Sequence, residues 1–370
     1  MFRNAILAAV FAYLVYGTVK YLMFMDVFKV SFKHYPGTCK KVKGARYGSE
    51  DMAWTREGLV FVTTGLSTPA VEKHLLATGT HGEIQLFDFQ NPTSGVVNLK
   101  IEHSKDLNLT KTRFHGITLQ EDKTKGEHIL YVLNHPSGED SELIEKFKFS
   151  PSTRQLSHLK TIELDNSFFF NNIVALSEDQ FFITNFAYMP SKSVFFHALV
   201  NLFHVSLGSL HFYNGTSSTA VTPRLLTPNG VALSPDQRHV YVAATMEQSV
   251  YVYYRDSSTN TLSLVQKVYL GIKGDNLNLT PEGDALLLGA IPVFYKMVIH
   301  LMWALSPDCI SPSSVLRIPL GADGLVQESD ITELFYDPGD LISGSSTAAT
   351  YKDQLLIGSV ANSLVHCQSS

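Results

Sequence analysis

The most regular feature of the chain is a pair of alternating apolar runs that flank a polar turn. In Asn229–Ala243 the first run leads into Ser234-Pro-Asp236, and the second run ends with Val-Tyr-Val-Ala. A period of two on both sides of a Pro-Asp turn predicts a β-hairpin. The same pattern begins again at five other places, which are Ser49, His115, Asn171, Asp275 and Ser345.

The six hairpins follow one another at spacings between 46 residues (229 to 275) and 70 residues (275 to 345). Repeats of this length, each with two strong strands, are typical of the four-stranded blades of a propeller. The repeats run from Glu50 to Val360. We therefore predict an all-β chain in which residues 26–370 form one six-bladed β-propeller domain.

A residue that can hold a metal, a proton or a hydrogen bond stands at the start of every copy. These residues are Glu50, His115, Asn171, Asn229, Asp275 and Ser345. The innermost strands of a propeller line its central axis, so copies that start at the same end bring these side chains together at one face.

Most of these first residues have oxygen atoms in their side chains. Carboxylates mixed with amide oxygens suit a hard cation, and Ca²⁺ above all. The members of this predicted calcium cluster are Glu50, Asn171, Asn229, Asp275 and Asn276. Asp51 follows Glu50, and adjacent strand residues point to opposite faces, so this pair could serve two ions, or one ion and one backbone contact. The alternative is that Asn and Asp mark the turns before the strands.

Two histidines are predicted at the same face as the oxygen cluster. His115 opens the second copy, and the hairpin returns to that face at Asn134-His-Pro136. His115 and His135 could therefore act together as a base near neutral pH. A structural hydrogen-bonding role is the alternative for each of them.

Two unusually apolar connections, Val194–Phe212 and Ile291–Leu305, also fall on this face. The first has helical spacing at Val194, Ala198, Leu202 and Val205. Both are long for loops, and both are flanked by propeller repeats, which argues against membrane spans. They are predicted to be helical insertions, either as a buried lid over the axis or as an amphipathic canopy facing membrane or substrate.

The N-terminus differs from the rest of the chain. The 22 residues Asn4–Met25 carry a single charge, Lys20, and are long enough to cross a bilayer. We predict a signal anchor over residues 1–25; a cleaved signal peptide is less favoured because no small-x-small site follows the apolar run. A net charge of −5 without a long basic run excludes nucleic acid as an expected partner.

Lysines and glycosylation sequons give opposite indications of the compartment in which the propeller lies. Five lysines follow the anchor, namely Lys29, Lys33, Lys40, Lys41 and Lys43. Taken alone, they would place the body in the cytosol. The glycosylation sequons at Asn108-Leu-Thr and Asn214-Gly-Thr favour the secretory lumen instead.

The three cysteines decide between these compartments. Cys39 precedes the first repeat and Cys367 follows the last, so a disulfide between them would join the two ends of the propeller. Such a bond persists in an oxidising compartment, and Cys309 is left as a free thiol. We therefore predict a membrane-anchored protein of the endoplasmic reticulum or plasma membrane, with the propeller lumenal or extracellular.

Five motifs connect the chain to a known family. They are Gly48-Ser-Glu-Asp51, His115-Gly-Ile117, Asn134-His-Pro136, Asn229-Gly230 and Asp275-Asn276. With these motifs the chain resembles the paraoxonase/arylesterase family from Tyr35 to Cys367. The resemblance implies a six-bladed propeller with two calcium ions, a retained hydrophobic N-terminus and a disulfide between the ends. It also implies hydrolysis of lactones, aryl esters and organophosphates.

The resemblance assigns a role to each motif residue. The catalytic calcium would be held by Glu50, Asn171, Asn229, Asp275 and Asn276. It would polarise the substrate carbonyl, and His115 with His135 would activate water. Asp51 and the carbonyl of Ile117 match ligands of a structural calcium. The chain departs from the family at Asn172, where the family has Asp, and losing that carboxylate weakens the second site electrostatically.

Two further departures make the surroundings of the site more apolar. The chain has Asn185-Phe186-Ala187 where the family has Asn-Asp-His, and Ala290-Ile291 where it has Cys-His. The first hypothesis is a calcium-dependent hydrolase of carboxylic esters or lactones. The alternative is a non-catalytic, membrane-anchored propeller that assists a membrane protein such as an ion channel, because the chain is similar to anchored invertebrate relatives of that kind.

Overall fold

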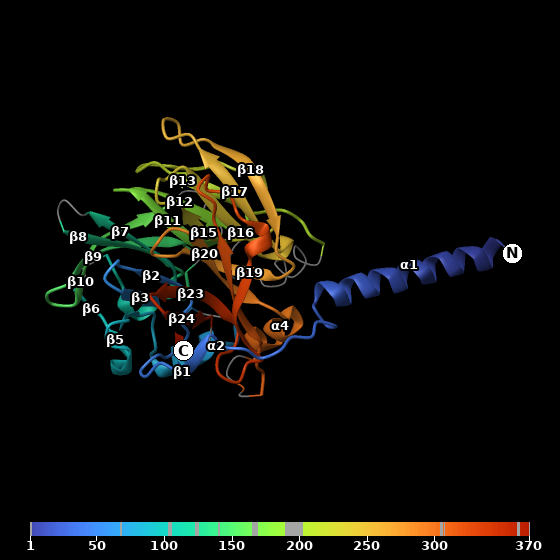
Figure 1. The fold of residues 1–370 in the computed structure, drawn as a ribbon, viewed down its shortest axis with the longest axis horizontal. Coiled ribbons are helices and arrows are strands. Elements are labelled where there is room, and N and C mark those ends of the chain that lie inside the picture. The colour runs from blue at the N-terminus through green and yellow to red at the C-terminus, as the bar shows by residue number, and fades with distance from the viewer. Residues whose placement is uncertain are drawn as a thin grey trace.

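The computed structural model describes residues 2–66, 69–102, 106–122, 126–139, 141–164, 169–188, 203–303, 306, 308–360 and 363–369 (Figure 1). Six sheets surround one axis, and the innermost strand of each contacts the innermost strands of both neighbours, so the ring closes. The six-bladed propeller is therefore confirmed. The innermost strands are β2 (Met52–Trp54), β7 (Phe114–Asp122), β11 (Phe170–Ser177), β15 (Pro228–Leu233), β19 (Lys273–Leu279) and β23 (Ser345–Tyr351).

Each blade is an antiparallel meander that continues outward from its inner strand. The second strands are β3 (Leu59–Thr63), β8 (Glu127–Asn134), β12 (Gln180–Asn185), β16 (His239–Ala244), β20 (Ala285–Ile291) and β24 (Gln354–Ser359). The third strands are β4 (Ile84–Asp88), β9 (Leu143–Ser150), β13 (Ser209–Tyr213), β17 (Ser249–Arg255), β21 (Ser313–Pro319) and β25 (Val365–Ser369). The outermost strands are β5 (Val96–Asn98), β10 (Gln155–Glu163), β14 (Ser218–Ala220), β18 (Leu262–Tyr269), β22 (Thr332–Asp337) and β1 (Gly37–Lys41), and β6 (Lys100–Glu102) pairs in parallel with β10.

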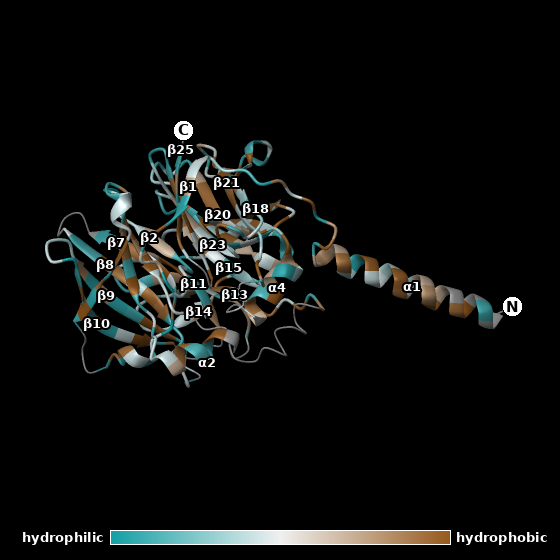
Figure 2. Cartoon of the chain, turned by 90° about the horizontal axis from the view of Figure 1, so that it is seen from below, coloured by the Kyte–Doolittle hydropathy of each residue, from teal (hydrophilic) through white to brown (hydrophobic). Residues whose placement is uncertain are grey.

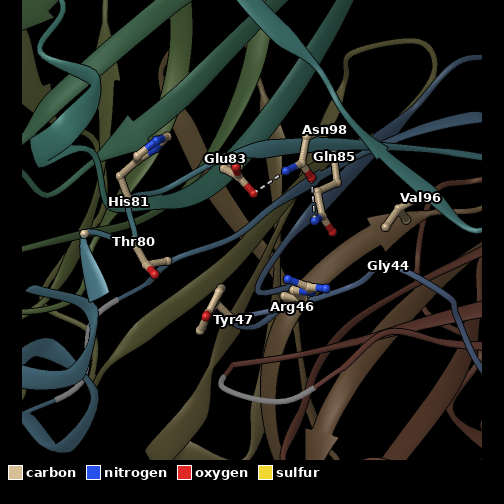
Figure 3. Close-up of a pocket in the computed structure, with 10 residues that line it drawn as sticks. Gly44, Arg46, Tyr47, Thr80, His81, Glu83, Gln85, Val96 and Asn98 are labelled. Atoms are coloured by element: carbon tan, nitrogen blue, oxygen red, sulfur yellow. Dashed lines mark hydrogen bonds between the residues drawn. The ribbon is translucent and has the colours of Figure 1, made fainter. Parts of the chain in front are cut away.

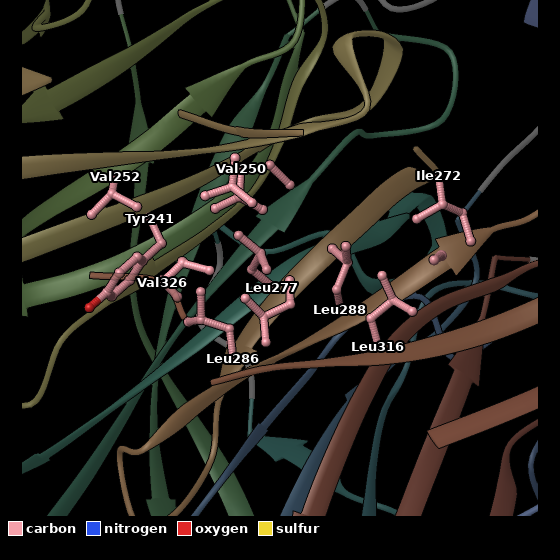
Figure 4. Close-up of a cluster of buried hydrophobic side chains, with 14 residues drawn as sticks. Tyr241, Val250, Val252, Ile272, Leu277, Leu286, Leu288, Leu316 and Val326 are labelled. Atoms are coloured by element: carbon pink, nitrogen blue, oxygen red, sulfur yellow. The ribbon is translucent and has the colours of Figure 1, made fainter. Parts of the chain in front are cut away.

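The hydrophobic core lies between the blades. The buried apolar residues form one cluster at each of the six blade–blade contacts. Between the fourth and fifth blades, Val250 and Val252 of β17 belong to the same buried cluster as Leu286 and Leu288 of β20 (Figure 4). Because successive strand residues face opposite sides, an alternating apolar run supplies the face that each blade buries.

The N- and C-terminal strands close the propeller. β1 pairs with β25, and Cys39 lies directly opposite Cys367 with 4.0 Å between their Cα atoms. The two cysteines form a disulfide, as the sequence predicted, and Cys309 is a free, partly buried thiol.

Removing this disulfide is expected to destabilise the propeller strongly. Replacing Cys39 and Cys367 together by alanine frees a loop closed over a sequence separation of 328 residues. Loss of such a bond typically costs about 2–5 kcal/mol. Denaturant unfolding of the double variant should show this loss, whereas Cys309→Ser should unfold near the wild-type midpoint. Equal midpoints for both variants would mean that the bond does not secure the closure.

The N-terminal segment forms the helix α1 (Phe2–Phe24), which projects away from the propeller (Figures 1 and 2). Its end is held by the buried Lys273 of β19, whose Nζ donates to the carbonyl of Phe24 (2.7 Å) and to Asp26 (2.8 Å). Within the described part of the chain, no helix combines the length and apolar character that crossing a membrane requires. The predicted span is therefore not confirmed.

The two predicted insertions are only partly as expected. α4 (Phe294–Met302) is a helix inside the second one, but Ile291 is still the last residue of β20. In the first, residues 194–202 lie outside the described residues. Ser209–Phe212 belong to β13, paired with β12, so that boundary was wrong. The cause is the alternation from Ser209 to Tyr213, which continues the blade. The helix α2 (Pro69–Thr78) was not predicted.

Candidate functional site

Five of the six inner strands carry a β-bulge near their first residues. In β7 the pairs are Phe114 with Asn134 and Ile117 with Val132, so three steps on β7 oppose two on β8. β11, β15 and β19 have the same irregularity, and β23 has a shorter one. A bulge re-aims side chains that a regular strand would place on opposite faces. The predicted site residues at the starts of β7, β11, β15 and β19 all lie in these bulges.

Glu50 is the residue around which one half of the site is arranged. Its side chain is 1% exposed. Its Oε1 accepts a hydrogen bond from Asn276 Nδ2 (2.8 Å) and lies 3.3 Å from His115 Nε2. Ser346 Oγ donates to the Glu50 carbonyl (2.7 Å). The structure thus brings together side chains of the first, second, fifth and sixth blades. The sixth blade contributes Ser346. Ser345 was predicted instead, but its hydroxyl donates to carbonyls of the fifth blade, those of Ala290 and Ser314.

Asp51 turns away from Glu50 and has partners of its own. Its Oδ2 accepts hydrogen bonds from the backbone N–H of Ile117 (3.0 Å) and from Asn172 Nδ2 (2.9 Å). Its Oδ1 accepts one from Thr347 (3.2 Å). Asn172 Nδ2 also donates to Asn276 Oδ1 (2.6 Å). Three protein donors therefore surround the Asp51 carboxylate, and the uncharged Asn172 links it to the cluster around Glu50.

The remaining members of the predicted calcium cluster are buried beside these residues. Asn229 hydrogen-bonds the Asp275 carboxylate, and the charge of Glu50 also acts on Asp275. Asn171 is 5% exposed and precedes Asn172 in the bulge of β11. Three oxygen atoms remain buried without a hydrogen-bond partner, namely Glu50 Oε2, Asn171 Oδ1 and Asn229 Oδ1. Unpaired buried acceptors are costly, so this cluster fits a cation.

Burial shifts the pKa values of the carboxyl groups of the site strongly upward. Burial raises the pKa of Glu50 to about 8. It also raises the pKa of Asp275 well above the usual value, with the Glu50 charge as the second cause. Among the described residues, no three His, Cys, Asp or Glu side chains are grouped as a metal site. The cluster instead mixes carboxylates with Asn amides, which suits Ca²⁺ better than Zn²⁺.

The two histidines form a hydrogen-bonded pair. His115 Nδ1 and His135 Nε2 are 2.7 Å apart, and His135 Nδ1 is paired with the carboxylate of Glu142. The ring of Phe169 packs against both imidazoles, at centroid distances of 6.4 and 5.7 Å. Burial, with the charge of His135 as a second cause, lowers the pKa of His115 well below its usual value. His115 is therefore a neutral imidazole at pH 7.

Sequence reasoning did not find Glu142 or Phe169. Glu142 follows Glu139 and Asp140 closely in the sequence, and nothing in the sequence distinguishes these three acids. Phe186, which was expected to make the surroundings of the site more apolar, packs on Phe169 at a centroid distance of 5.2 Å.

The predicted glycosylation sites lie in exposed turns. Asn108 Oδ1 accepts from the backbone N–H of Thr110 (3.2 Å), and Asn214 Oδ1 from that of Thr216 (3.0 Å). Both side chains are accessible on the surface.

A separate polar pocket of about 570 Å³ lies on the first blade (Figure 3). Asn98 donates to Glu83 (2.7 Å) and accepts from Gln85 (2.8 Å) along its wall. The pocket is lined by Gly44, Arg46, Tyr47, Gly79, Thr80, His81, Glu83, Gln85, Val96 and Asn98. None of them belongs to the axial cluster, so this pocket is distinct from the candidate site.

The sequence model of the family described as arylesterase matches residues 33–369. The chain belongs to the arylesterase family. It is 30% identical to serum paraoxonase/lactonase 3 of Rattus norvegicus, over 90% of this chain and 89% of that one. It is 29% identical to serum paraoxonase/arylesterase 1 of Homo sapiens, over 89% of this chain and 88% of that one.

One solved structure supports the fold independently. A luciferin-regenerating enzyme matches with a TM-score of 0.51 and 12% identity, over 89% of this chain and 94% of that one. At this identity the match concerns architecture alone. At the level of the family, the comparisons support a hydrolase of esters or lactones.

Proposed function

We propose that this protein is a calcium-dependent hydrolase of carboxylic esters, including lactones. The observation that supports it most is the set of buried, unpartnered oxygens of Glu50, Asn171 and Asn229, with His115 Nε2 lying 3.3 Å from Glu50 Oε1. Oxygens that lack donors fit a hard cation, and a neutral imidazole beside them fits a general base.

The ion would be held by Glu50, Asn171, Asn229, Asp275 and Asn276. When bound, calcium supplies a positive charge that polarises a substrate carbonyl and stabilises the oxyanion. The protein contributes the rest. Burial of the cluster excludes bulk water, and the bulged strands fix the side chains before substrate arrives. His115 accepts a proton from water, because its lowered pKa keeps it neutral at pH 7.

The residues around Asp51 do not fit a second ion. Ile117 N–H, Asn172 Nδ2 and Thr347 Oγ1 all donate to this carboxylate, so protein donors stand where a cation would have to approach. Asn172 carries no charge to help attract one. We therefore propose one calcium ion for each chain rather than two.

Replacing Asn172 by aspartate is expected to create a second calcium site. The change removes the donor between Asp51 and Asn276 and puts a second carboxylate directly beside Asp51. Equilibrium dialysis should give one calcium per wild-type chain and two per Asn172→Asp chain. Asn214→Asp, an exposed change whose side-chain oxygen still accepts from the Thr216 N–H, should leave the number at one. Two ions in the wild type would contradict the reading of Asp51.

Stability of the metal-free protein is expected to fall between pH 7.5 and 8. In the folded protein Glu50 releases its proton at about pH 8, and the pKa of Asp275 is also raised. In the unfolded chain both carboxyls are ionised throughout this window, and the histidines, whose ordinary pKa is about 6.5, have already lost most of their protons. The unfolded state therefore binds fewer protons, so the free energy of unfolding decreases as pH rises. Thermal unfolding in chelator should show this slope, and saturating calcium should remove it.

The substrate assay separates the proposal from its alternative. Phenyl acetate and δ-valerolactone should be hydrolysed by the wild type, the rate should vanish with chelator, and added calcium should restore it. A protein that binds calcium but hydrolyses neither compound would favour the alternative, a non-catalytic partner of a membrane protein. The observation favouring that alternative is the exposure of Phe203 (70%), Met302 (55%) and Trp303 (53%).

We also propose a secretory location. The Cys39–Cys367 bond persists in an oxidising compartment, and both sequons are exposed. The same proposal includes a membrane anchor, which would hold the protein in the endoplasmic reticulum or at the plasma membrane. Enzymatic deglycosylation of protein from secretory cells should increase its gel mobility, and an unchanged mobility would contradict the lumenal orientation.

A further inference from the structure

We propose that Glu142 is the positioning residue that fixes the proton arrangement of the histidine pair. This inference rests on the proposed hydrolase function, because it states how that site prepares its base. The Glu142 carboxylate, the His135 ring and the His115 ring form a line that ends at Glu50. Glu142 lies outside the five motifs that connect the chain to its family.

Backbone pairing brings Glu142 to His135. Asn134, the last residue of β8, pairs with Leu143, the first residue of β9. His135 and Glu142 flank that pair, so they face each other where the loop between the strands begins and ends. Glu142 is 3% exposed and the His135 side chain 12%, so the interaction is largely shielded from water. His135 is held further by its backbone N–H, which donates to the Arg113 carbonyl (3.0 Å).

The order of donors and acceptors along this line determines where the protons are. A carboxylate only accepts hydrogen bonds, and a neutral imidazole has one N–H and one bare nitrogen. The Glu142 carboxylate makes the closer approach to the pair, and within the described part of the chain neither its Oε2 nor His135 Nδ1 has another hydrogen-bond partner. At the other end, Glu50 Oε1 already accepts from Asn276 Nδ2 (2.8 Å). We therefore assign the proton to His135 Nδ1, which leaves His135 Nε2 bare. His115 Nδ1 must then donate to His135 Nε2 across 2.7 Å. The consequence is a bare His115 Nε2, directed at Glu50 Oε1 and the oxygen cluster.

This arrangement prepares His115 for one proton transfer. The bare Nε2 takes a proton from water, the water oxygen forms a bond to the ester carbon, and the carbonyl electron pair moves to its oxygen. When the C–O bond to the leaving group breaks, the proton passes from Nε2 to the leaving oxygen. The sum is ester plus water giving acid plus alcohol. Glu142 stabilises the transient positive charge through His135, as a carboxylate oriented on an imidazole does.

In the described part of the chain, the pair is in contact with two carboxylates and one aromatic ring. Phe169 covers both rings, and Glu50 lies beside His115. Asn134 is engaged elsewhere, because its side chain donates to Glu145 (2.9 Å) and accepts from the Arg113 N–H (3.0 Å). Glu142 is thus the carboxylate that pairs with His135, whereas Glu50 belongs to the axial cluster.

The test compares Glu142→Gln with Glu139→Gln in the full chain with calcium bound. Glu139 is in the same loop, but it is 42% exposed and paired with Lys111. With phenyl acetate, Glu142→Gln should lower kcat about 10–100-fold with KM within about twofold, and Glu142→Asp should recover part of the loss. The acid limb of the kcat/KM profile should move to lower pH, since the carboxylate no longer stabilises the imidazolium. Glu139→Gln should change none of these values.

A double variant and a spectroscopic measurement complete the test. In a His135→Gln background, adding Glu142→Gln should cost less than about twofold more, because both act through one interaction. Nitrogen-15 NMR of the histidines should show His135 protonated at Nδ1 and His115 bare at Nε2 in the wild type, with this pattern lost in Glu142→Gln. An unchanged pattern, an unchanged kcat, or additive losses would overturn the proposal. If the wild type hydrolyses no ester, the hydrolase proposal fails, and the NMR pattern alone decides the role of Glu142.

Discussion

Alanine in place of Asp275 is expected to abolish both the stabilisation by calcium and the turnover of esters. Asp275 and Glu50 are buried together, and the charge of Glu50 disfavours ionisation of Asp275 unless a cation lies between them. A ligand that binds only the folded protein stabilises it by about 2.7 kcal/mol at 100 times its dissociation constant. Wild-type protein should gain this much from calcium, and Asp275→Ala should gain almost none.

The metal-free form of the variant provides the internal control. Without calcium, Asp275 is a buried carboxyl whose pKa is raised by burial and by Glu50, so its removal relieves repulsion. Asp275→Ala in chelator should therefore be at least as stable as the wild type in chelator, which shows that it folds. Glu282→Ala is a matched control, because Glu282 is exposed at the far end of the same hairpin. A calcium response in Asp275→Ala equal to that of the wild type would contradict the ligand assignment.

The parts of the fold that depend on strand periodicity were predictable from the sequence. Alternation of apolar residues determines which face of each strand is buried, so six hairpins were enough to predict six blades. The disulfide followed from the same argument, because a closed ring must join its ends, and Cys39 and Cys367 lie directly opposite each other on β1 and β25. His115 and His135 were predicted at one face for the same reason.

The parts that depend on bulges and loops were not predictable. A regular strand would have put Ser345 toward the axis, but the irregularity in β23 directs its hydroxyl to the fifth blade and gives Ser346 the contact with Glu50. A shift of one residue exchanges the two faces of a strand. The role of Glu142 depends on a loop conformation that alternation does not determine.

The apolar residues that distinguish this chain from the family pattern lie next to the histidine pair in the folded protein. Phe186 and Ala187 stand where the resemblance to the family implies polar residues, and Phe186 packs on Phe169, which covers the histidine pair. A less polar surrounding strengthens each remaining hydrogen bond. It also increases the cost of an unpaired charge. The pair in this chain therefore depends on Glu142 more than it would in a polar setting.

Glutamine in place of His115 is expected to slow ester hydrolysis by a factor of about 10²–10⁴ while leaving calcium binding intact, the usual scale for losing a general base. Glutamine keeps a polar side chain of similar reach, and the unpartnered oxygens of Asn171 and Asn229 are untouched. The measurement is kcat with phenyl acetate at saturating calcium, together with the calcium-dependent shift of the unfolding midpoint.

His128→Gln is the matched control for this variant. His128 is also a histidine of the second blade, but it lies at the opposite end of the β7–β8 hairpin, beside Glu121. It should turn over esters at the wild-type rate. If His115→Gln keeps full activity, the base lies elsewhere, even if calcium binds as proposed. If His115→Gln loses calcium binding as well, His115 acts in building the site, and the assignment of a proton-accepting role would be wrong.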